Sequence, residues 1–146
     1  MKKIALGADH GGYELKNILM NHLVNKGYEV VDFGTNSAES VDYPHFAKAV
    51  GESVTSGQTQ LGILVCGTGI GISIAANKIK GVRCALCTNT TMARLTREHN
   101  DANILALGGR IVGDVLAIEM VETFLTTKFE GGRHSKRVGL ISCMEE

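Results

Sequence analysis

Residues 61–71 have the sequence LGILVCGTGIG, and this stretch decides the fold class. Its first six residues, Leu61–Cys66, are almost wholly apolar, as expected of a central parallel strand that is buried on both faces. Glycines follow at positions 67, 69 and 71, and a helical segment begins near Gly69 and stops near Gly81. The order of buried strand, glycine loop and helix is typical of an α/β protein.

The same alternation extends outward in both directions along the chain. Four further strands are predicted, at residues 3–8, 29–32, 83–87 and 104–107. Helix-period stripes of apolar residues separate them, a helix with an apolar stripe from 117 to 125 follows the last strand, and a short helical tail begins near Arg133. Strict β-α alternation with short connections predicts a doubly wound, Rossmann-like, five-stranded parallel sheet with helices on both faces. We expect residues 1–146 to form a single domain.

Composition limits the partners that this domain can have. Fifteen basic residues balance fifteen acidic ones, so no long-range field attracts nucleic acid or an anionic membrane. No apolar run approaches the length of a membrane-spanning helix, and the first residues lead straight into a strand rather than a signal peptide. The four cysteines lack the spacing of a disulfide framework, which favours a reducing, cytoplasmic location. Cys84 and Cys87 are three residues apart on a predicted strand, so they face opposite ways, and burial explains them better than metal binding.

The glycine loop excludes several familiar phosphate-binding motifs. A dinucleotide fingerprint needs a glycine at position 72, where this chain has Ile72. A Walker A loop needs a Gly-Lys-Ser/Thr sequence, which is missing. A cysteine phosphatase needs an arginine at the same position 72, so Cys66 is not expected to attack phosphorus. What remains is a loop of backbone N–H groups that can receive an anion.

Cys66 has two interpretations at this point. It is either an inert thiol at the end of a core strand, since free cysteine is often buried, or a functional thiol. Its place directly before a glycine loop and a helix N-terminus favours function, because that setting stabilises a thiolate.

Six segments together carry a resemblance to a known family over nearly the whole chain. They are Ala8-Asp9-His10-Gly11-Gly12, Asp42-Tyr43-Pro44, Cys66-Gly67-Thr68-Gly69-Ile70-Gly71, Ala75-Ala76-Asn77-Lys78, His99-Asn100-Asp101-Ala102-Asn103 and Gly131-Gly132-Arg133-His134-x-x-Arg137. In this order they resemble the type B ribose-5-phosphate isomerase family. Some relatives in that family use a glutamate in the glycine loop instead of the cysteine. Because Ile72 stands at that position here, this chain is similar to the cysteine-base branch.

The resemblance implies an aldose–ketose isomerase acting on a phosphorylated pentose. Cys66 would be the base that moves a proton between C1 and C2. The Thr68 hydroxyl would assist the loop in stabilising the developing oxyanion. Backbone N–H groups of the loop would stabilise the enediolate; this loop comprises Gly67, Thr68, Gly69, Ile70 and Gly71. His99 would open the sugar ring, because histidine can donate and accept protons near neutral pH. No step requires a metal or an organic cofactor.

The remaining candidates would bind the substrate. Asp9, Tyr43 and Asn100 are expected near the sugar hydroxyls, although Tyr43 can also be a loop residue that packs on the rim. The candidates for the phosphate group are His10, Arg110, Arg133 and Arg137. Arg133 and Arg137 are four residues apart, which on a helix places both guanidinium groups on one face; without the resemblance, a solvated basic tail is the simpler interpretation.

The other histidines have plainer interpretations. His22 lies on the apolar side of the first predicted helix and is expected to have a hydrogen-bonding partner there. His45 is placed in a loop before the next helix, and His134 can face either way.

Two alternative functions stay open at this stage. One is isomerisation of a six-carbon sugar phosphate; galactose 6-phosphate enzymes resemble this chain but tend to lack the paired arginines, and allose 6-phosphate is harder to exclude. The other is a non-catalytic sugar-phosphate sensor on the same fold.

The predicted topology also indicates a dimer. Cys66 ends a strand, whereas His99 ends the helix that runs back to the opposite edge of the sheet, a span of roughly 13 Å for nine helical residues. One site that uses both residues therefore requires a two-fold homodimer, or a dimer of such dimers, with shared active sites.

Overall fold

The computed structural model describes residues 2–145, so the two terminal residues of the expected 1–146 domain lie outside it. Strands and helices alternate through most of the chain and are bounded as follows: β1 Lys3–Ala8, α1 Tyr13–Asn25, β2 Glu29–Asp32, α2 Tyr43–Thr55, β3 Leu61–Cys66, α3 Ile70–Ala76, β4 Cys84–Leu86, α4 Thr90–Asn100, β5 Ile104–Gly108, α5 Asp114–Thr126 and α6 Arg133–Cys143.

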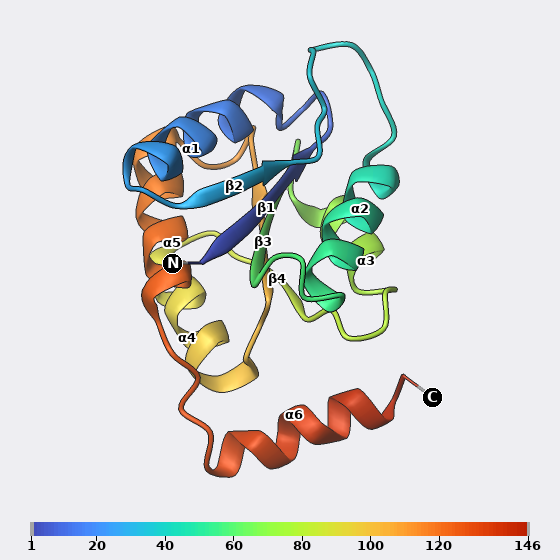
Figure 1. Ribbon diagram of the computed structural model, residues 1–146, viewed down its shortest axis with the longest axis vertical. Helices are drawn as coiled ribbons and strands as arrows, with labels where there is room; N and C mark the ends of the chain where they lie inside the picture. The colour runs from blue at the N-terminus through green and yellow to red at the C-terminus, as the bar shows by residue number, and fades with distance from the viewer. Residues whose placement is uncertain (1, 146) are drawn as a thin grey trace.

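The strands form one five-stranded sheet in the order β2-β1-β3-β5-β4 (Figure 1). Every neighbouring pair is parallel, which confirms the predicted sheet. The apolar strand β3 lies in the middle, and all six of its residues are buried. The strands therefore end side by side, and the loops after β1, β3 and β5 meet at one edge.

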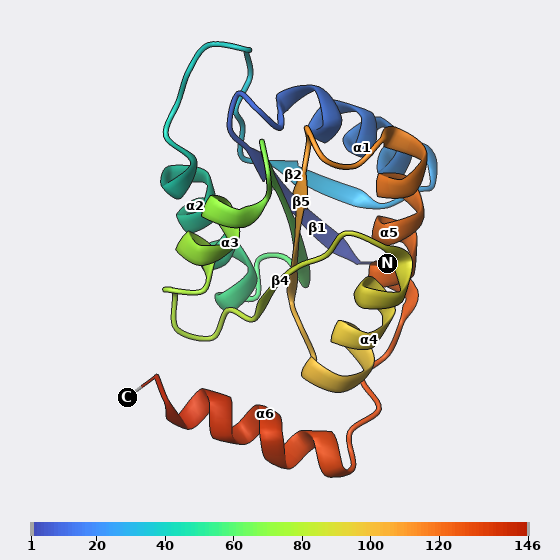
Figure 2. The same cartoon turned by 180° about the vertical axis from the view of Figure 1, so that it is seen from behind.

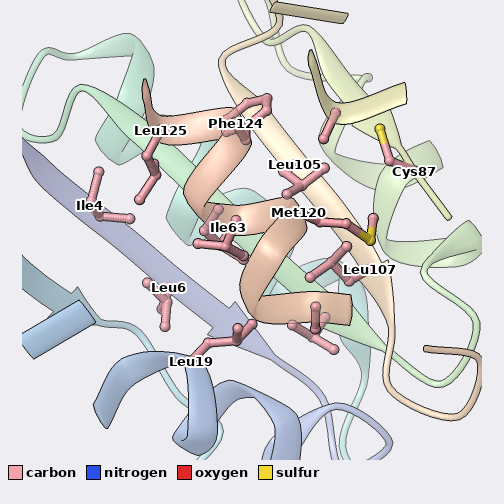
Figure 3. Close-up of a cluster of buried hydrophobic side chains, with 14 of the residues drawn as sticks. Ile4, Leu6, Leu19, Ile63, Cys87, Leu105, Leu107, Met120, Phe124 and Leu125 are labelled. Atoms are coloured by element: carbon pink, nitrogen blue, oxygen red, sulfur yellow. The ribbon is translucent and has the colours of Figure 1, made fainter. Parts of the chain in front are cut away.

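Two hydrophobic cores, one on each face of the sheet, confirm the doubly wound prediction. The first lies between the sheet and helices α1, α4 and α5, and its central side chains surround α5 (Figure 3). The α5 side chains in it recur at helical spacing, and Met120 and Phe124 are completely buried. The second core lies against α2 and α3. Cys87 belongs to the first core and Cys84 packs against the second, so the two thiols face opposite sides as predicted.

Strands β4 and β5 differ from their predicted bounds by one residue at one or both ends, and two helix boundaries differ by more. Helix α2 begins at Tyr43, so Tyr43 and His45 lie in its first turns rather than in a loop. Pro44 explains this start, since its fixed φ and missing N–H suit the first turn of a helix. Helix α3 ends at Ala76 rather than near Gly81, because the Asn77 side chain bonds the backbone N–H and C=O of Cys84 and turns the chain toward β4.

Helix α6 stands apart from the rest of the molecule, as both views show (Figures 1 and 2). Its first turn contacts α4, and near its end the Glu145 carboxylate accepts a hydrogen bond from the Gly81 N–H. A hollow of about 690 Å³ lies beside it and is lined by residues from the turn after α3, from β4 and the segment before it, from α4 and from the end of α6. None of the helices within residues 2–145 has the length and apolar character needed to cross a bilayer.

Candidate active site

The first group of candidate residues lies at the carboxyl edge of the sheet. The loops after β1, β3 and β5 are joined there by backbone hydrogen bonds that continue the sheet pattern. The N–H of Asp9 donates to the carbonyl of Val65 at 3.2 Å, and the N–H of Gly109 donates to that of Cys66 at 2.8 Å. The N–H of Arg110 donates to the carbonyl of Gly67 at 2.9 Å. These contacts fix the loops relative to one another through backbone rather than through side chains.

Cys66 occupies the centre of this edge. Its residue is only 4% exposed, and its Sγ accepts a hydrogen bond from the N–H of Gly69 at 3.1 Å. Gly69 has a φ of +80°, a conformation that glycine adopts without strain, and this turns its N–H back toward the sulfur. The backbone donor therefore points at the one atom of Cys66 that can act as a base or nucleophile.

Three side chains lie around the backbone of the glycine loop: that of Thr68, which belongs to the loop, and those of Tyr43 and Arg110. The Thr68 Oγ1 accepts from the N–H of Ile70 at 3.2 Å, which leaves its own hydrogen free to be donated. The ring of Tyr43 lies directly over Gly71, since a β-carbon on Gly71 would come 2.6 Å from the tyrosine Cζ. The guanidinium of Arg110 lies over Gly67 in the same way, at 3.1 Å from such a β-carbon.

Asp9 and His10 organise the neighbouring loops. Asp9 is buried, and its Oδ1 accepts hydrogen bonds from the N–H groups of Gly11 and Gly12 at 2.9 and 3.2 Å. The Nδ1 of His10 accepts from the N–H of Val41 at 3.1 Å and so holds the segment that leads into α2. One carboxylate oxygen of Asp9 therefore accepts hydrogen bonds within its own loop. His10 holds a second loop at the same edge.

The second group of candidate residues lies at the opposite end of the molecule. His99 and Asn100 close α4, whose end leads through residues 101–103 into the amino end of β5. Arg133 and Arg137 are exposed on α6, which lies at this end in both views (Figures 1 and 2). The structure thus brings Asp9, His10, Tyr43, Cys66–Gly71 and Arg110 together, and separates them from His99, Asn100, Arg133 and Arg137.

Around His99 the structure assembles a cluster of three side chains. The rings of His99 and His134 stack, with centroids 4.3 Å apart and planes 15° from parallel. The Oε1 of Glu130 lies 3.7 Å from the Nε2 of His99 and 3.5 Å from that of His134. Burial lowers the pKa of His134, and the neighbouring His99 and Arg133 lower it further. The side chain of His99 is 37% exposed beside the same carboxylate, so it is the ring of the two that a substrate can reach.

The same cluster holds three atoms of the kind that bind metals, all within 4.8 Å of one another. The lone pair of an imidazole nitrogen lies in the plane of its ring, and these two rings are nearly parallel and stacked. Their lone pairs therefore do not converge on one point, and a shared ion would require one ring to turn. The arrangement suits proton exchange between the rings, the carboxylate and a substrate better than it suits coordination.

Comparison with known proteins identifies the family to which this architecture belongs. The sequence profile described as Ribose/Galactose Isomerase matches residues 4–141. The chain belongs to this family. It is 51% identical to the ribose-5-phosphate isomerase B of Escherichia coli K12, over 100% of this chain and 98% of that protein. Membership makes it an enzyme of the aldose–ketose isomerase type.

Solved structures of family members superpose on nearly the whole chain. The ribose-5-phosphate isomerase B of Clostridium thermocellum is 59% identical, with a TM-score of 0.97, over 98% of this chain and 97% of that one. The enzyme of Mycoplasma genitalium, solved with bound ribulose-5-phosphate, is 44% identical, with a TM-score of 0.94, over 98% and 95% of the two chains. The resemblance seen in the sequence motifs therefore extends to the arrangement of the isomerase fold.

Within this isomerase, the cluster around His99 contains a residue that the sequence did not indicate. Glu130 directly precedes the Gly131–Arg137 motif, but nothing in its local pattern distinguishes it from a solvated loop carboxylate. His134, which the sequence left undecided, is buried against His99. His22 has the expected partner, since its Nε2 lies 2.6 Å from the Oε1 of Glu122 on α5.

The other cysteines are poor nucleophiles or lie away from the loop. Burial raises the pKa of Cys84 to about 12 and that of Cys87 to about 11, so both stay protonated at neutral pH. Cys143 is exposed on α6. Cys66 is the thiol that has both a place in the isomerase glycine loop and a backbone donor on its sulfur.

Proposed function

We propose that the protein interconverts D-ribose 5-phosphate and D-ribulose 5-phosphate through an enediolate, with Cys66 as the base and His99 opening the ring. The observation that carries this proposal is the Cys66 sulfur held by the Gly69 N–H at the mouth of the glycine loop. Family membership and the curated relative with this activity support the choice of reaction. A bound ribulose-5-phosphate in the Mycoplasma genitalium relative supports the choice of sugar.

Ring opening is the first step from the aldose side. A proton passes to the ring oxygen while the C1 hydroxyl gives one up, so the bond between C1 and the ring oxygen breaks and the aldehyde forms. The proton count is unchanged, which suits a histidine that can both donate and accept. The Oε1 of Glu130 lies 3.7 Å from the Nε2 of His99, so a carboxylate stands beside the ring that must deliver the first proton.

Proton transfer between C2 and C1 is the second step. The Cys66 thiolate takes the proton from C2, and negative charge develops on the C1 oxygen as the enediolate forms. The C2 hydroxyl then gives its proton to the C1 oxygen, and the Cys66 thiol returns a proton to C1 as the C2 ketone forms. Backbone N–H groups of residues 67–71 can donate to the enediolate, and they need no reorganisation because the loop is already fixed. The Thr68 hydroxyl hydrogen, which the Ile70 N–H leaves free, adds a further donor.

The substrate would bridge the two groups of residues. We assign the sugar hydroxyls to Asp9, Tyr43 and Asn100, and the phosphate to His10, Arg110, Arg133 and Arg137. Both α6 arginines are exposed and one helical turn apart, so their guanidinium groups can converge on one phosphate.

A shared site in a two-fold dimer would join these groups, as the topology predicted. Exposed apolar side chains support such an assembly. Ile70 of the glycine loop, Ile74 of α3, Ile111 after β5 and Val115 of α5 are 51%, 58%, 60% and 69% exposed. Leu140 and Ile141 on α6 are 59% and 44% exposed. A second copy would cover apolar surface at both ends while placing its His99 near this chain's Cys66. The association of two dimers remains a prediction, and so does the cytoplasmic location.

Deuterium exchange tests this function directly. Incubation with ribose 5-phosphate in deuterated water should yield ribulose 5-phosphate with deuterium at C1, visible by NMR. A sugar-phosphate sensor would bind the substrate without exchange, and that outcome would overturn the proposal. Allose 6-phosphate and galactose 6-phosphate, measured in parallel, should react with lower kcat/KM; a higher value for either would change the assigned sugar.

A further inference from the structure

Asp101 belongs to the motif around His99, yet the proposed chemistry does not use it. It follows Asn100 at the end of α4 and has φ and ψ of +47° and +44°. Within residues 2–145 it is the non-glycine residue with a positive φ. Such a conformation is disfavoured for a residue with a side chain and persists when its surroundings hold it. The surrounding structure therefore fixes the backbone directly after His99 and Asn100.

Two arginines from different elements hold the Asp101 carboxylate. The Nη1 of Arg97, on α4, lies 3.0 Å from Oδ1, and the Nη2 of Arg83, which precedes β4, lies 3.4 Å from Oδ2. The side chains of Arg97 and Arg83 are only 11% and 21% exposed, so solvent weakens these pairs less than it weakens surface pairs. Each carboxylate oxygen thus has a guanidinium partner of its own.

The same guanidinium groups also hold the backbone at the end of α4. The Nε of Arg83 donates to the carbonyls of Asn100 and Asp101 at 3.1 and 3.0 Å. The Nη1 of Arg97 donates to the carbonyl of Ala102 at 2.6 Å. The last carbonyls of a helix have no partner within it, and here the two arginines supply one. Asp101 keeps both arginines in place for this role.

The clamp also fixes the segment that carries Glu130. The Nε of Arg97 donates to the carbonyl of Thr127 at 3.3 Å, and the N–H of Glu130 donates to the carbonyl of Glu98 at 3.1 Å. Residues 127–130 are thereby tied to the last turn of α4 at both ends. The distance between His99 and the Glu130 carboxylate depends on that connection.

We propose that Asp101, acting through Arg83 and Arg97, is a positioning residue for His99 and Asn100 in the ring-opening step. This rests on the proposed function, because it assigns a supporting residue to the ring-opening site. The carboxylate would not touch the substrate. It would hold the end of α4 so that the His99 imidazole meets the ring oxygen of the sugar, and a small displacement there is costly to a proton transfer.

The chemistry of the two sugars allows ring opening to be isolated. Ribose 5-phosphate is mostly a closed ring, whereas ribulose 5-phosphate stays open because its C5 oxygen carries the phosphate. Exchange of the C1 hydrogen of ribulose 5-phosphate with deuterated water therefore requires Cys66 but no ring opening. Turnover of ribose 5-phosphate requires both steps, so the ratio of the two rates reports on His99 and whatever positions it.

The test compares Asp101→Asn with wild type in both reactions. Asparagine tolerates a positive φ but carries no charge for the arginines, so the backbone is kept and the clamp is weakened. Turnover of ribose 5-phosphate should fall roughly tenfold in kcat, while exchange from ribulose 5-phosphate should fall less than about twofold. Asp101→Gly fits the positive φ without strain and should lower the same rate while leaving the other nearly unchanged. It replaces Asp101→Asn if that variant folds poorly.

Glu98→Gln is the matched control. It breaks the Arg94–Glu98 pair, which has the same i,i+4 spacing on the same helix and the same 3.0 Å separation as the Arg97–Asp101 pair. Both rates should stay within about twofold of wild type, because the Arg94 side chain is 48% exposed and the pair makes no hydrogen bond to another element among the described residues.

His99→Ala gives the reference ratio of the two rates, turnover of ribose 5-phosphate and exchange from ribulose 5-phosphate. It also separates this inference from the proposed function. If His99→Ala lowers this ratio and both Asp101 variants lose the two rates equally, or match wild type, Asp101 is not a positioning residue. If His99→Ala leaves the ratio unchanged, the ring-opening assignment and this inference are both wrong. If wild type exchanges no hydrogen from ribulose 5-phosphate, the proposed function itself fails.

Discussion

The regions around Cys66 and His99 are built in opposite ways. The Cys66 region consists of loops after central strands, joined backbone to backbone, and Cys66 and Asp9 are 4% and 6% exposed. The His99 region consists of side chains at the ends of two helices, where the side chains of His99 and Glu130 are 37% and 52% exposed. The sheet of one chain fixes the first region completely. The second depends on ion pairs and on a helix that has few contacts within the chain.

This difference matches what each half of the reaction requires. Proton transfer between adjacent carbons needs donors and base held within narrow limits, and a backbone scaffold supplies that precision. Capture of a phosphate and opening of a ring need charged groups that can close around a mobile ligand. We expect substitutions of Cys66 and its glycine loop to affect kcat, and substitutions of the α6 arginines to affect substrate capture.

The largest effect should come from Cys66→Ala. Loss of the base should lower kcat by about 10²- to 10⁴-fold, while binding of a sugar phosphate measured by calorimetry stays within a few-fold. Cys143→Ala, which removes the exposed thiol of α6, should leave the rate unchanged. If binding weakens in proportion to the rate, Cys66 is a structural residue.

Mixing two inactive variants tests whether the two regions meet across a dimer. Cys66→Ala and His99→Ala subunits, mixed under conditions that allow exchange, should recover about a quarter of wild-type activity per total site, because half of the dimers are mixed and each has one intact site. Mass spectrometry of the mixture establishes the exchange. Proven exchange without recovered activity would show that both residues act within one chain.

Arg137→Ala should act mainly on substrate capture. Loss of a charge-assisted hydrogen bond to phosphate corresponds to about a 10- to 100-fold rise in KM, with a smaller fall in kcat. Lys136→Ala is the matched control, since it removes an adjacent exposed cation of α6 that lies off the Arg133–Arg137 face. Equal effects of the two variants would restore the interpretation of a solvated basic tail.

The smallest effect should come from Gly71→Ala in the rigid region. The added methyl group would press on the Tyr43 ring at 2.6 Å, so the ring must tilt and the loop must shift. We expect roughly a fivefold loss in kcat/KM. Gly113→Ala, where a β-carbon meets nothing within 4 Å, controls for the general effect of replacing glycine. A Gly71→Ala enzyme with wild-type kinetics would show that the loop is more adaptable than its hydrogen bonds indicate.

The fold and the carboxyl-edge group were predictable because both follow from local pattern. The apolar run 61–66 and the alternation of strand and helix determine the sheet, and parallel strands bring their loops to one edge. The start of α2 at Tyr43 differs from the prediction, because the first turn of a helix accommodates Pro44 and the apolar stripe of this helix begins only after it.

The cluster around His99 could not be derived in the same way. Glu130 and His134 reach His99 through the irregular segment 127–132, whose path has no periodicity that a sequence pattern can reveal. The Asp101 clamp likewise joins residues from α4 and from the chain before β4. Such contacts are set by how elements pack, and a single sequence does not record that.

Helix α6 also has a consequence for chains that end early. Both hydrophobic cores are complete by Leu125, and no α6 residue belongs to either core among the described residues. A chain that ends between Leu125 and Arg133 would therefore keep every side chain of both cores. It would lack Arg133 and Arg137. Such a product could fold and persist, yet it would have lost its proposed means of holding phosphate.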